Sequence, residues 1–556
     1  MAQQRRDFLQ RFFPKQTLQD LAAQTQSAPA APSPEVIALN RIAYGPRPGE
    51  VASVQKKGLK QYIEAQLNPK DSQDTLLKQA LAKARLKIKY KGKAGKFPSV
   101  DENRPLKLLN ASVDQLWKLR DRKKVHRKER QRAAQEVLVA TWLRATYSKW
   151  QLREVMVEFW HNHFNVSVQA DERIALTLPI YDREVIRKNC FGNFRTFLEE
   201  VAKSVAMQYY LDNVYSKASP ANENYARELF ELHTLGADHY LNHLYDQWRE
   251  VPGATEGKPQ GYIDEDVYEA ARAFTGWTIA DGSRIKGGER LPNTGKFYYY
   301  EGWHDNYQKR VLGTEFSSNQ PPMADGQKVL DLVAYHPGTA QFVCTKLCRR
   351  LVADEPPQAL VDRAVTTWIK HQKSPDQIKQ VLRTILFSPE FTQNWGKKVK
   401  RPFELMISFL RATEAQITPH QNMNYMLHNM GYMQYQWPTP TGHPDVASYW
   451  VNSNMMLTRW NLMSTLLFGR RWHQSVKFNI KQQTPDSAKS AYEITDFWIK
   501  RILNGNTKPQ TRSMLANFLA GGGSPSEPPF GNPKDVNFRL KAMVALIGMT
   551  PDFQWR

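Results

Sequence analysis

Polar side chains that could transfer protons or bind a metal gather in three short stretches, and the first runs from residue 222 to 236 (NENYARELFELHTLG). Successive helical residues turn by about 100°, so several polar side chains fall on one arc of this stretch. They are Glu223, Asn224, Arg227, Glu228, Glu231 and Thr234. Glu228 is the candidate general base or metal ligand, Arg227 the candidate anion clamp, and Asn224 a further polar group of the same site. The alternative is an ordinary solvated helix, because Glu223–Arg227 and Arg227–Glu231 have the four-residue spacing of intrahelical ion pairs.

The second stretch is EFWHNH, residues 158–163, at the end of a strongly apolar helical pattern. Glu158 and His161 share a helix face, and a helix that ends near residue 162 would let His161 and His163 point into one cavity. Together with Glu228, the two imidazoles could hold a single divalent transition metal. No second Glu-x-x-His lies on a matching helix, which argues against a dinuclear centre. Alternatively, His161 caps carbonyl groups at the helix C-terminus and His163 packs in the core.

The third stretch places His304 directly before Asp305. A carboxylate beside a histidine could orient its ring or share a metal, although adjacent residues point in different directions in most backbones. The sequence contains no Gly-x-Ser-x-Gly elbow, no HExxH, no P-loop and no glycine-rich dinucleotide fingerprint. The marks of α/β-hydrolase, zincin, P-loop and dinucleotide-dependent enzymes are therefore missing.

Helical periodicity dominates the elements that must position these groups. Helices are expected at 35–67, 133–160, 181–208, 222–236, 264–277, 326–350, 359–387, 402–431 and near 536–547. The best strand candidate lies between 280 and 313 and contains KFYYYEG, which indicates a hairpin. The expected fold class is mainly α, a multi-helix body with one or two small β-hairpin insertions.

The chain is basic, and its 556 residues carry a formal net charge of +23. The charge is concentrated in residues 78–132, which we expect to be part helix and part loop. Such a surface attracts polyanions such as an acidic polysaccharide, although a plain solvated face is the alternative. Zinc-finger spacing and RNA-binding aromatic motifs are absent, which argues against nucleic acid as the partner. No apolar run approaches the roughly 20 residues of a membrane helix, so no transmembrane segment is expected.

The N-terminus holds a partial export signal. Arg5 and Arg6, followed by Phe8 and Leu9, are typical of a twin-arginine leader, but Pro14 soon interrupts the apolar core that should follow. Residues 1–33 are interpreted as a degenerate twin-arginine-like leader and linker. Export to the periplasm and retention in the cytoplasm both remain open.

The motifs taken in order resemble those of the bacterial family catalogued as domain of unknown function 1800. The stretches that carry the resemblance are FWHNHF, NENYARELFELHTLG, DVYEAARAFTGW, KRVLG, HPGTAQFVCTKLCRRLV, ILFSPEF, KRPFE and PTPTGHPDVASYW. The resemblance covers residues 34–467, with a basic insertion at about 78–132, and leaves 468–556 as a C-terminal helical extension. It implies a mostly helical protein, often exported, and often encoded beside a protein with an alkaline-phosphatase-like fold. It implies no established reaction.

These observations predict a helical enzyme with one polar site. The 222–236 helix would supply Glu228, Arg227 and Asn224, the His304–Asp305 loop would approach it, and a metal would be held by His161, His163 and Glu228. Apart from this possible divalent transition metal, the cofactor is unknown. The expected substrate is polar or anionic, such as a glycan. The alternative is a non-catalytic binding or assembly partner of an exported alkaline-phosphatase-like protein or of an anionic polymer.

Overall fold

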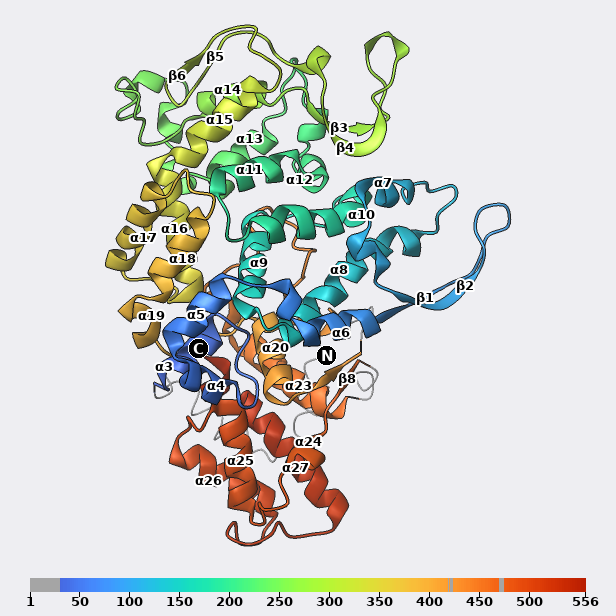
Figure 1. Cartoon of the computed structure of the whole chain (residues 1–556), viewed down its shortest axis with the longest axis vertical. Helices are drawn as coiled ribbons and strands as arrows, with labels where there is room; N and C mark the ends of the chain where they lie inside the picture. Colours follow the sequence, from blue (N-terminus) through green and yellow to red (C-terminus); the bar gives the residue numbers. More distant parts are fainter. Residues whose placement is uncertain (1–30, 419, 421–423, 470–474) are drawn as a thin grey trace.

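Two largely buried helices, α8 (Arg127–Tyr147) and α9 (Gln151–His163), lie in the middle of the molecule (Figure 1). The sequence predicts one continuous helix over 133–160, but the chain turns at Ser148, which has an extended backbone. Ser148 Oγ accepts a hydrogen bond from Trp150 N at 3.0 Å, and Gln151 Nε2 donates to the Ala145 carbonyl at 3.1 Å. These bonds satisfy backbone groups left open at the ends of the two helices. The break therefore sets the direction of the helix that carries His161 and His163.

The computed structural model describes residues 31–418, 420, 424–469 and 475–556. The twin-arginine-like segment at Arg5–Arg6 lies outside these residues. Within them, no helix has both the length and the hydrophobicity that crossing a membrane requires.

The N-terminal part consists of short helices and one long hairpin. Its elements are α3 (Pro34–Arg41), α4 (Glu50–Lys57), α5 (Leu59–Leu67), α6 (Thr75–Lys83), β1 (Arg85–Tyr90), β2 (Val100–Pro105) and α7 (Val113–Lys118). The β1–β2 hairpin projects from the body (Figure 1). The sequence predicts helix and loop here, but RLKIKY alternates buried Leu86 and Ile88 with exposed basic residues, which is the period of a strand.

The central and upper parts hold the three stretches of interest. Their elements are α10 (Glu172–Ile180), the π-helix η3 (Tyr181–Arg187), α11 (Phe194–Lys203), α12 (Val205–Tyr210), α13 (Asn224–Glu228), the π-helix η5 (Leu229–His233), α14 (Asp264–Ala273), β3 (Trp277–Asp281), β4 (Asn293–Tyr299), β5 (Lys309–Val311), β6 (Thr314–Phe316) and α15 (Ala324–Tyr335). β3 pairs with β4 as an antiparallel hairpin, as KFYYYEG predicts.

The regular elements of the remaining chain are helices apart from two short strands. Its elements are α16 (Pro337–Leu351), α17 (Gln358–Lys370), α18 (Gln377–Leu386), α19 (Pro389–Gln393), α20 (Pro402–Ala412), β7 (Gln416–Ile417), α21 (Tyr425–His428), α22 (Ala447–Trp450), α23 (Ser453–Phe468), β8 (Val476–Lys477), α24 (Ile480–Gln483), α25 (Ala491–Leu503), α26 (Pro509–Ala520), α27 (Pro533–Met549) and α28 (Pro551–Gln554).

One hydrophobic core runs from Ala38 near the N-terminus to Phe553 in the last helix. α27 packs against α23, so segments on both sides of residue 467 contribute to that core. The mainly α fold class with small β-hairpin insertions is confirmed, because the described strands form only two-stranded sheets.

Candidate functional site

Glu228 is a half-buried carboxyl group at the end of α13. Burial raises the pKa of Glu228 to about 7, the negative charge of Glu231 adds to the rise, and Arg227 opposes it. Among the described residues, Glu228 makes no hydrogen bond or ion pair that would favour its charged form. Glu228 is thus a carboxyl group that can exchange a proton near neutral pH.

Arg227 turns toward other carboxylates. Its guanidinium lies 3.4 Å from Glu223 and 3.2 Å from Asp264, which also accepts a hydrogen bond of 2.8 Å from the Tyr240 hydroxyl. The Arg227–Glu231 pair that the spacing predicts is absent from the described residues. The reason is local: the chain changes to the π-helix η5 after Glu228, and its i→i+5 bonds change the rotation between residues 227 and 231.

The π-helix also alters the predicted polar arc. Thr234 is fully buried, and its hydroxyl donates to the Leu229 carbonyl at 2.6 Å. Asn224 stays exposed at the start of α13, where its backbone N–H donates to Asn222 Oδ1 at 3.0 Å. Gly236, with φ +90°, ends the segment, and a Cβ there would lie 2.6 Å from the Phe342 ring. Only glycine fits this position, and the chain can then leave η5 toward the next loop.

Two tyrosines lie within electrostatic reach of the carboxylates. Burial raises the pKa of Tyr210 to about 12, and the charge of Glu228 contributes to the rise. The Tyr210 hydroxyl donates to the Pro438 carbonyl at 3.0 Å. Burial and then the charge of Glu231 raise the pKa of Tyr262, whose buried hydroxyl has no hydrogen-bond partner among the described residues. Glu228, Glu231 and these two phenols form what we call the Glu228 cluster.

His161 forms a dyad with Asp182 of η3. Its Nε2 lies 3.1 Å from Asp182 Oδ1, while its buried Nδ1 has no hydrogen-bond partner within the described chain. Burial would raise the pKa of Asp182, but the positive charges of Arg187 and Arg144 outweigh it and hold that pKa well below its usual value. A charged Asp182 therefore fixes the proton on His161 Nε2.

His163 faces the opposite way, into an aromatic part of the core. It is 2% exposed, its Nε2 lies 3.1 Å from the His233 carbonyl, and its ring stacks on Phe159. Burial lowers the pKa of His163 well below its usual value, and the charge of Lys346 adds to the effect. This is the core placement expected as the alternative to a metal-binding role. His163 thereby ties the end of α9 to η5 at His233.

His304 and Asp305 have separate partners. His304 Nδ1 lies 2.8 Å from the Thr275 carbonyl and its Nε2 lies 3.3 Å from Asp325. Asp305 is held by Arg272 through bonds of 2.8 and 3.0 Å. Burial would raise the pKa of Asp305, but the hydrogen bonds from Arg272 and the Tyr307 N–H, together with the charges of Arg272 and Lys309, outweigh this and lower that pKa. The arrangement clamps the loop against α14 and α15.

The three predicted metal ligands thus have different surroundings: His161 faces Asp182, His163 faces the His233 carbonyl, and Glu228 faces Glu231. Within the described ranges, no group of three or more His, Cys, Asp or Glu residues is arranged to hold a metal ion. The metal set of His161, His163 and Glu228 stays a prediction.

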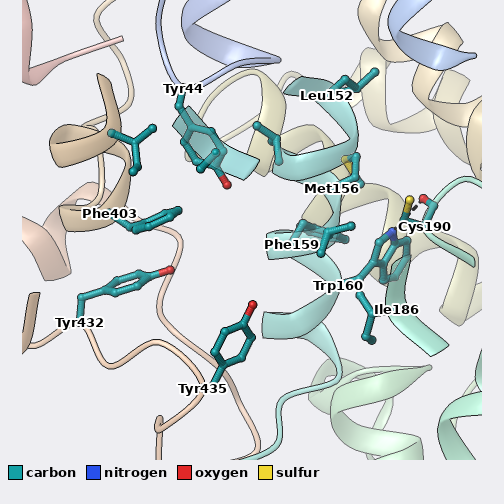
Figure 2. Packing of buried hydrophobic residues seen from close by; sticks show 14 of the residues in the cluster. Tyr44, Leu152, Met156, Phe159, Trp160, Ile186, Cys190, Phe403, Tyr432 and Tyr435 are labelled. Atoms are coloured by element: carbon teal, nitrogen blue, oxygen red, sulfur yellow. Dashed lines mark hydrogen bonds between the residues drawn. The ribbon is translucent and has the colours of Figure 1, made fainter. Parts of the chain in front are cut away.

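Sequence reasoning missed a buried ionic hub around Glu158. Glu158 accepts two hydrogen bonds of 3.0 Å from Arg401 and one of 2.7 Å from the Tyr432 hydroxyl, and Arg350 lies 3.1 Å away. Figure 2 shows Tyr44, Tyr432 and Tyr435 on one side of this region and α9 with Phe159 and Trp160 on the other. The motifs CRRLV and KRPFE contain Arg350 and Arg401, so their ordered occurrence was the available signal.

Glu404 extends the hub. It binds Arg350 and lies 3.3 Å from Arg401 and 2.9 Å from Arg556. Burial would raise the pKa of Glu404, but Arg350, Arg556 and Arg401 outweigh it and hold that pKa well below its usual value. The cavity beside the hub has a volume of about 20 Å³, which is enough for only one water molecule. The hub is therefore a tightly packed structural centre.

The fold and these contacts define a mainly helical protein with a buried ionic hub and a separate, half-exposed carboxylate cluster. The chain belongs to the family described as protein of unknown function (DUF1800), whose model matches residues 37–555. The match therefore continues through the segment 468–556, beyond the part that the motif resemblance covers. No curated protein and no solved structure matched the chain.

Proposed function

We propose that the protein is an enzyme that performs acid–base chemistry on a polar or anionic substrate such as a glycan, with Glu228 as the proton-transferring group. One observation carries this proposal: Glu228 is half-buried, has no partner among the described residues, and has a pKa raised to about 7. General acid–base catalysis is most effective when the pKa of the catalytic group lies near the working pH. An ordinary surface glutamate, with its pKa near 4.5, would transfer protons poorly at neutral pH.

Glu231 supports a two-carboxylate mechanism. Its charge helps to raise the pKa of Glu228, and it has no ion pair of its own among the described residues. Glycoside hydrolysis commonly uses one protonated and one ionised carboxyl group, the first to protonate the leaving oxygen and the second to assist the attack. In this proposal Glu228 is the acid and Glu231 is the second carboxyl group.

Arg227 and Asn224 would bind the substrate. Asn224 is exposed beside Glu228, and the Arg227 guanidinium is one-third exposed although it contacts Glu223 and Asp264. An arginine held in this way can still offer free N–H groups to a carboxylate or hydroxyl group. His304 and Asp305 act at a distance by holding their loop in place.

A turnover assay tests the proposal. Purified protein is incubated with a panel of neutral and acidic polysaccharides, and newly formed chain ends are measured. Glu228→Gln should reduce turnover on the order of a hundredfold or more, because the proton-transferring group is lost. Glu250→Gln is the matched control, since Glu250 is exposed and lies outside the Glu228 cluster. Turnover that Glu228→Gln leaves unchanged would overturn the assignment, and polymer binding without any turnover would favour the non-catalytic alternative.

A further inference from the structure

A groove of about 510 Å³ lies between α8, the segment after α9 and the chain around Gln434. Side-chain amides dominate its lining. They are Gln131, Gln135, Gln169, Asn424, Gln434 and Gln436. Amide groups both donate and accept hydrogen bonds, so a surface of this kind is suited to a ligand with many hydroxyl groups.

Two of these amides are buried, and the side-chain oxygen of each lacks a hydrogen-bond partner among the described residues. Gln434 is 4% exposed and Asn424 is 7% exposed. Gln434 Oε1 and Asn424 Oδ1 have no hydrogen-bond partner within the described residues. Buried polar atoms are normally paired, so these two oxygens leave unused hydrogen-bond acceptors in the protein layer behind the groove.

Tyr435 shapes the floor of the groove. Its backbone has φ +60°, a left-handed conformation that is strained for a bulky residue. Contacts hold it there: its hydroxyl shares a 2.7 Å hydrogen bond with Thr141, and its carbonyl accepts from Val168 N at 2.9 Å. Strain of this kind recurs at binding sites, where the surrounding structure enforces it.

A positively charged side chain lines the groove. Arg127 lines it, is exposed, and has no ion pair in the described part of the chain. Among the described residues that line the groove, Glu172 is the only carboxylate, and it is neutralised by Arg130 at 2.5 Å and Arg122 at 3.0 Å. As far as its lining is described, the groove therefore offers a free cation and no free carboxylate.

The β1–β2 hairpin extends this positive surface. Lys128 Nζ donates to the Lys89 carbonyl at 2.7 Å, and the His126 ring stacks on Tyr90 with centroids 3.9 Å apart, so the hairpin is fixed to the start of α8. The tip carries exposed lysines that have no ion pair among the described residues. They are Lys91, Lys93 and Lys96. Such a surface attracts a long anionic chain toward the groove.

We propose that this groove binds an anionic polysaccharide, whose hydroxyl groups pair with the accessible amides of Gln131, Gln135 and Gln169 while its carboxylates meet Arg127 and the hairpin lysines. Nucleic acid fits less well, because single strands are bound through bases that stack on open aromatic rings, whereas Tyr90 packs against His126. The inference rests on the proposed function in that it names the substrate class of the same enzyme.

The experiment measures binding without turnover, in the full chain carrying Glu228→Gln. Three probes separate the contributions: polygalacturonate offers charge and hydroxyl groups, its methyl ester offers hydroxyl groups alone, and single-stranded DNA offers charge without the hydroxyl pattern. Polygalacturonate should bind at least about tenfold more tightly than either of the others, the difference expected from one charge-assisted hydrogen bond. Arg127→Ala should weaken its binding by a similar factor, and Gln135→Ala should weaken both polygalacturonate and the ester.

Lys57→Ala on α4 is the control, because it removes the same charge from an exposed position outside the groove. Thermal unfolding of each variant shows that it folds. Equal binding of DNA and polygalacturonate, insensitive to Gln135→Ala, would overturn the inference in favour of a general polyanion surface. Failure of all three probes to bind would also overturn it while leaving the Glu228 assay unaffected. Binding without turnover in the unmodified protein would contradict the proposed enzyme alone.

Discussion

At Glu228 the chain keeps a carboxyl group half-buried without giving it a partner among the described residues, while nearby Arg227 is engaged by Glu223 and Asp264. Burial and then the charge of Glu231 raise the pKa of Glu228, and Arg227, whose guanidinium contacts other carboxylates, does not offset the rise. Asp182 shows the opposite case, since it is fully buried yet stays ionised because Arg144 and Arg187 lie beside it. Burial alone therefore does not decide the charge of a carboxyl group here; the guanidinium groups do.

The raised pKa of Glu228 makes stability depend on pH. Its pKa is about 7 in the fold and near 4.5 in the unfolded chain, so the folded protein loses stability as the pH rises from about 4.5 to 7. Glu228→Gln removes the ionisation and should stabilise the protein at pH 8 by about 1 to 2 kcal/mol, a figure reduced for partial solvent screening, with little effect at pH 4. Urea unfolding at both pH values measures this. Stabilisation of equal size at pH 4 and pH 8 would contradict the assigned cause.

At the scale of elements, the loop 435–443 and the end of α9 fit each other closely. The Asn162 side chain accepts from His443 Nδ1 at 2.9 Å, and Gly442 has φ +69°. A Cβ on Gly442 would lie 2.2 Å from the Asn162 carbonyl oxygen. The loop can therefore approach the end of α9 only because residue 442 is glycine. This contact holds in place the chain that runs between the groove and Tyr210.

Gly442→Ala should destabilise the protein by more than the roughly 1 kcal/mol that a left-handed alanine costs, because the clash adds to the backbone strain. Gly505→Ala is the matched control: Gly505 has φ +82° but open space around its Cβ position. The difference between the two midpoints of thermal unfolding isolates the steric contribution. Equal losses in both variants would show that the loop does not press on α9.

Several elements could be predicted from sequence and others could not. KFYYYEG predicts the β3–β4 hairpin because aromatic residues and flanking glycines favour strands. The β1–β2 hairpin was missed because lysines occupy its outward positions and weaken the strand signal. The π-helix after Glu228 has no sequence signature, so the spacing of Arg227 and Glu231 predicted a pair that the rotation prevents. Glu228 could be proposed from its motif, whereas the groove amides could not be grouped from the sequence because they lie on segments far apart in the chain.

At the scale of the whole molecule, the ionic hub joins segments from distant parts of the sequence. Glu158 lies on α9, Arg350 on α16, Arg401 and Glu404 at the start of α20, and Arg556 beyond α28. No local pattern could place these side chains together, because their meeting depends on how the helices pack. The hub is consistent with one family model matching residues 37–555, since it draws on most of that range.

Arg401→Ala should lower the free energy of unfolding by about 3 to 5 kcal/mol. The variant removes one of the two guanidinium groups that balance the buried carboxylate of Glu158. Arg512→Ala is the control, since its pair with Asp496 is more than 40% exposed and should contribute no more than about 1 kcal/mol. Chemical denaturation compares the two. A loss in Arg401→Ala as small as that in Arg512→Ala would show that the hub does not hold the segments together.

The proposed function requires that Glu228 exchange a proton near neutral pH. The most direct test is an NMR titration of protein labelled with carbon-13 at glutamate side-chain carboxyls, with Glu228→Gln used to assign the signal. We predict a midpoint near pH 7 for Glu228, which falls when Glu231→Gln removes the neighbouring charge. A midpoint near 4.5 in the unmodified protein would contradict the account.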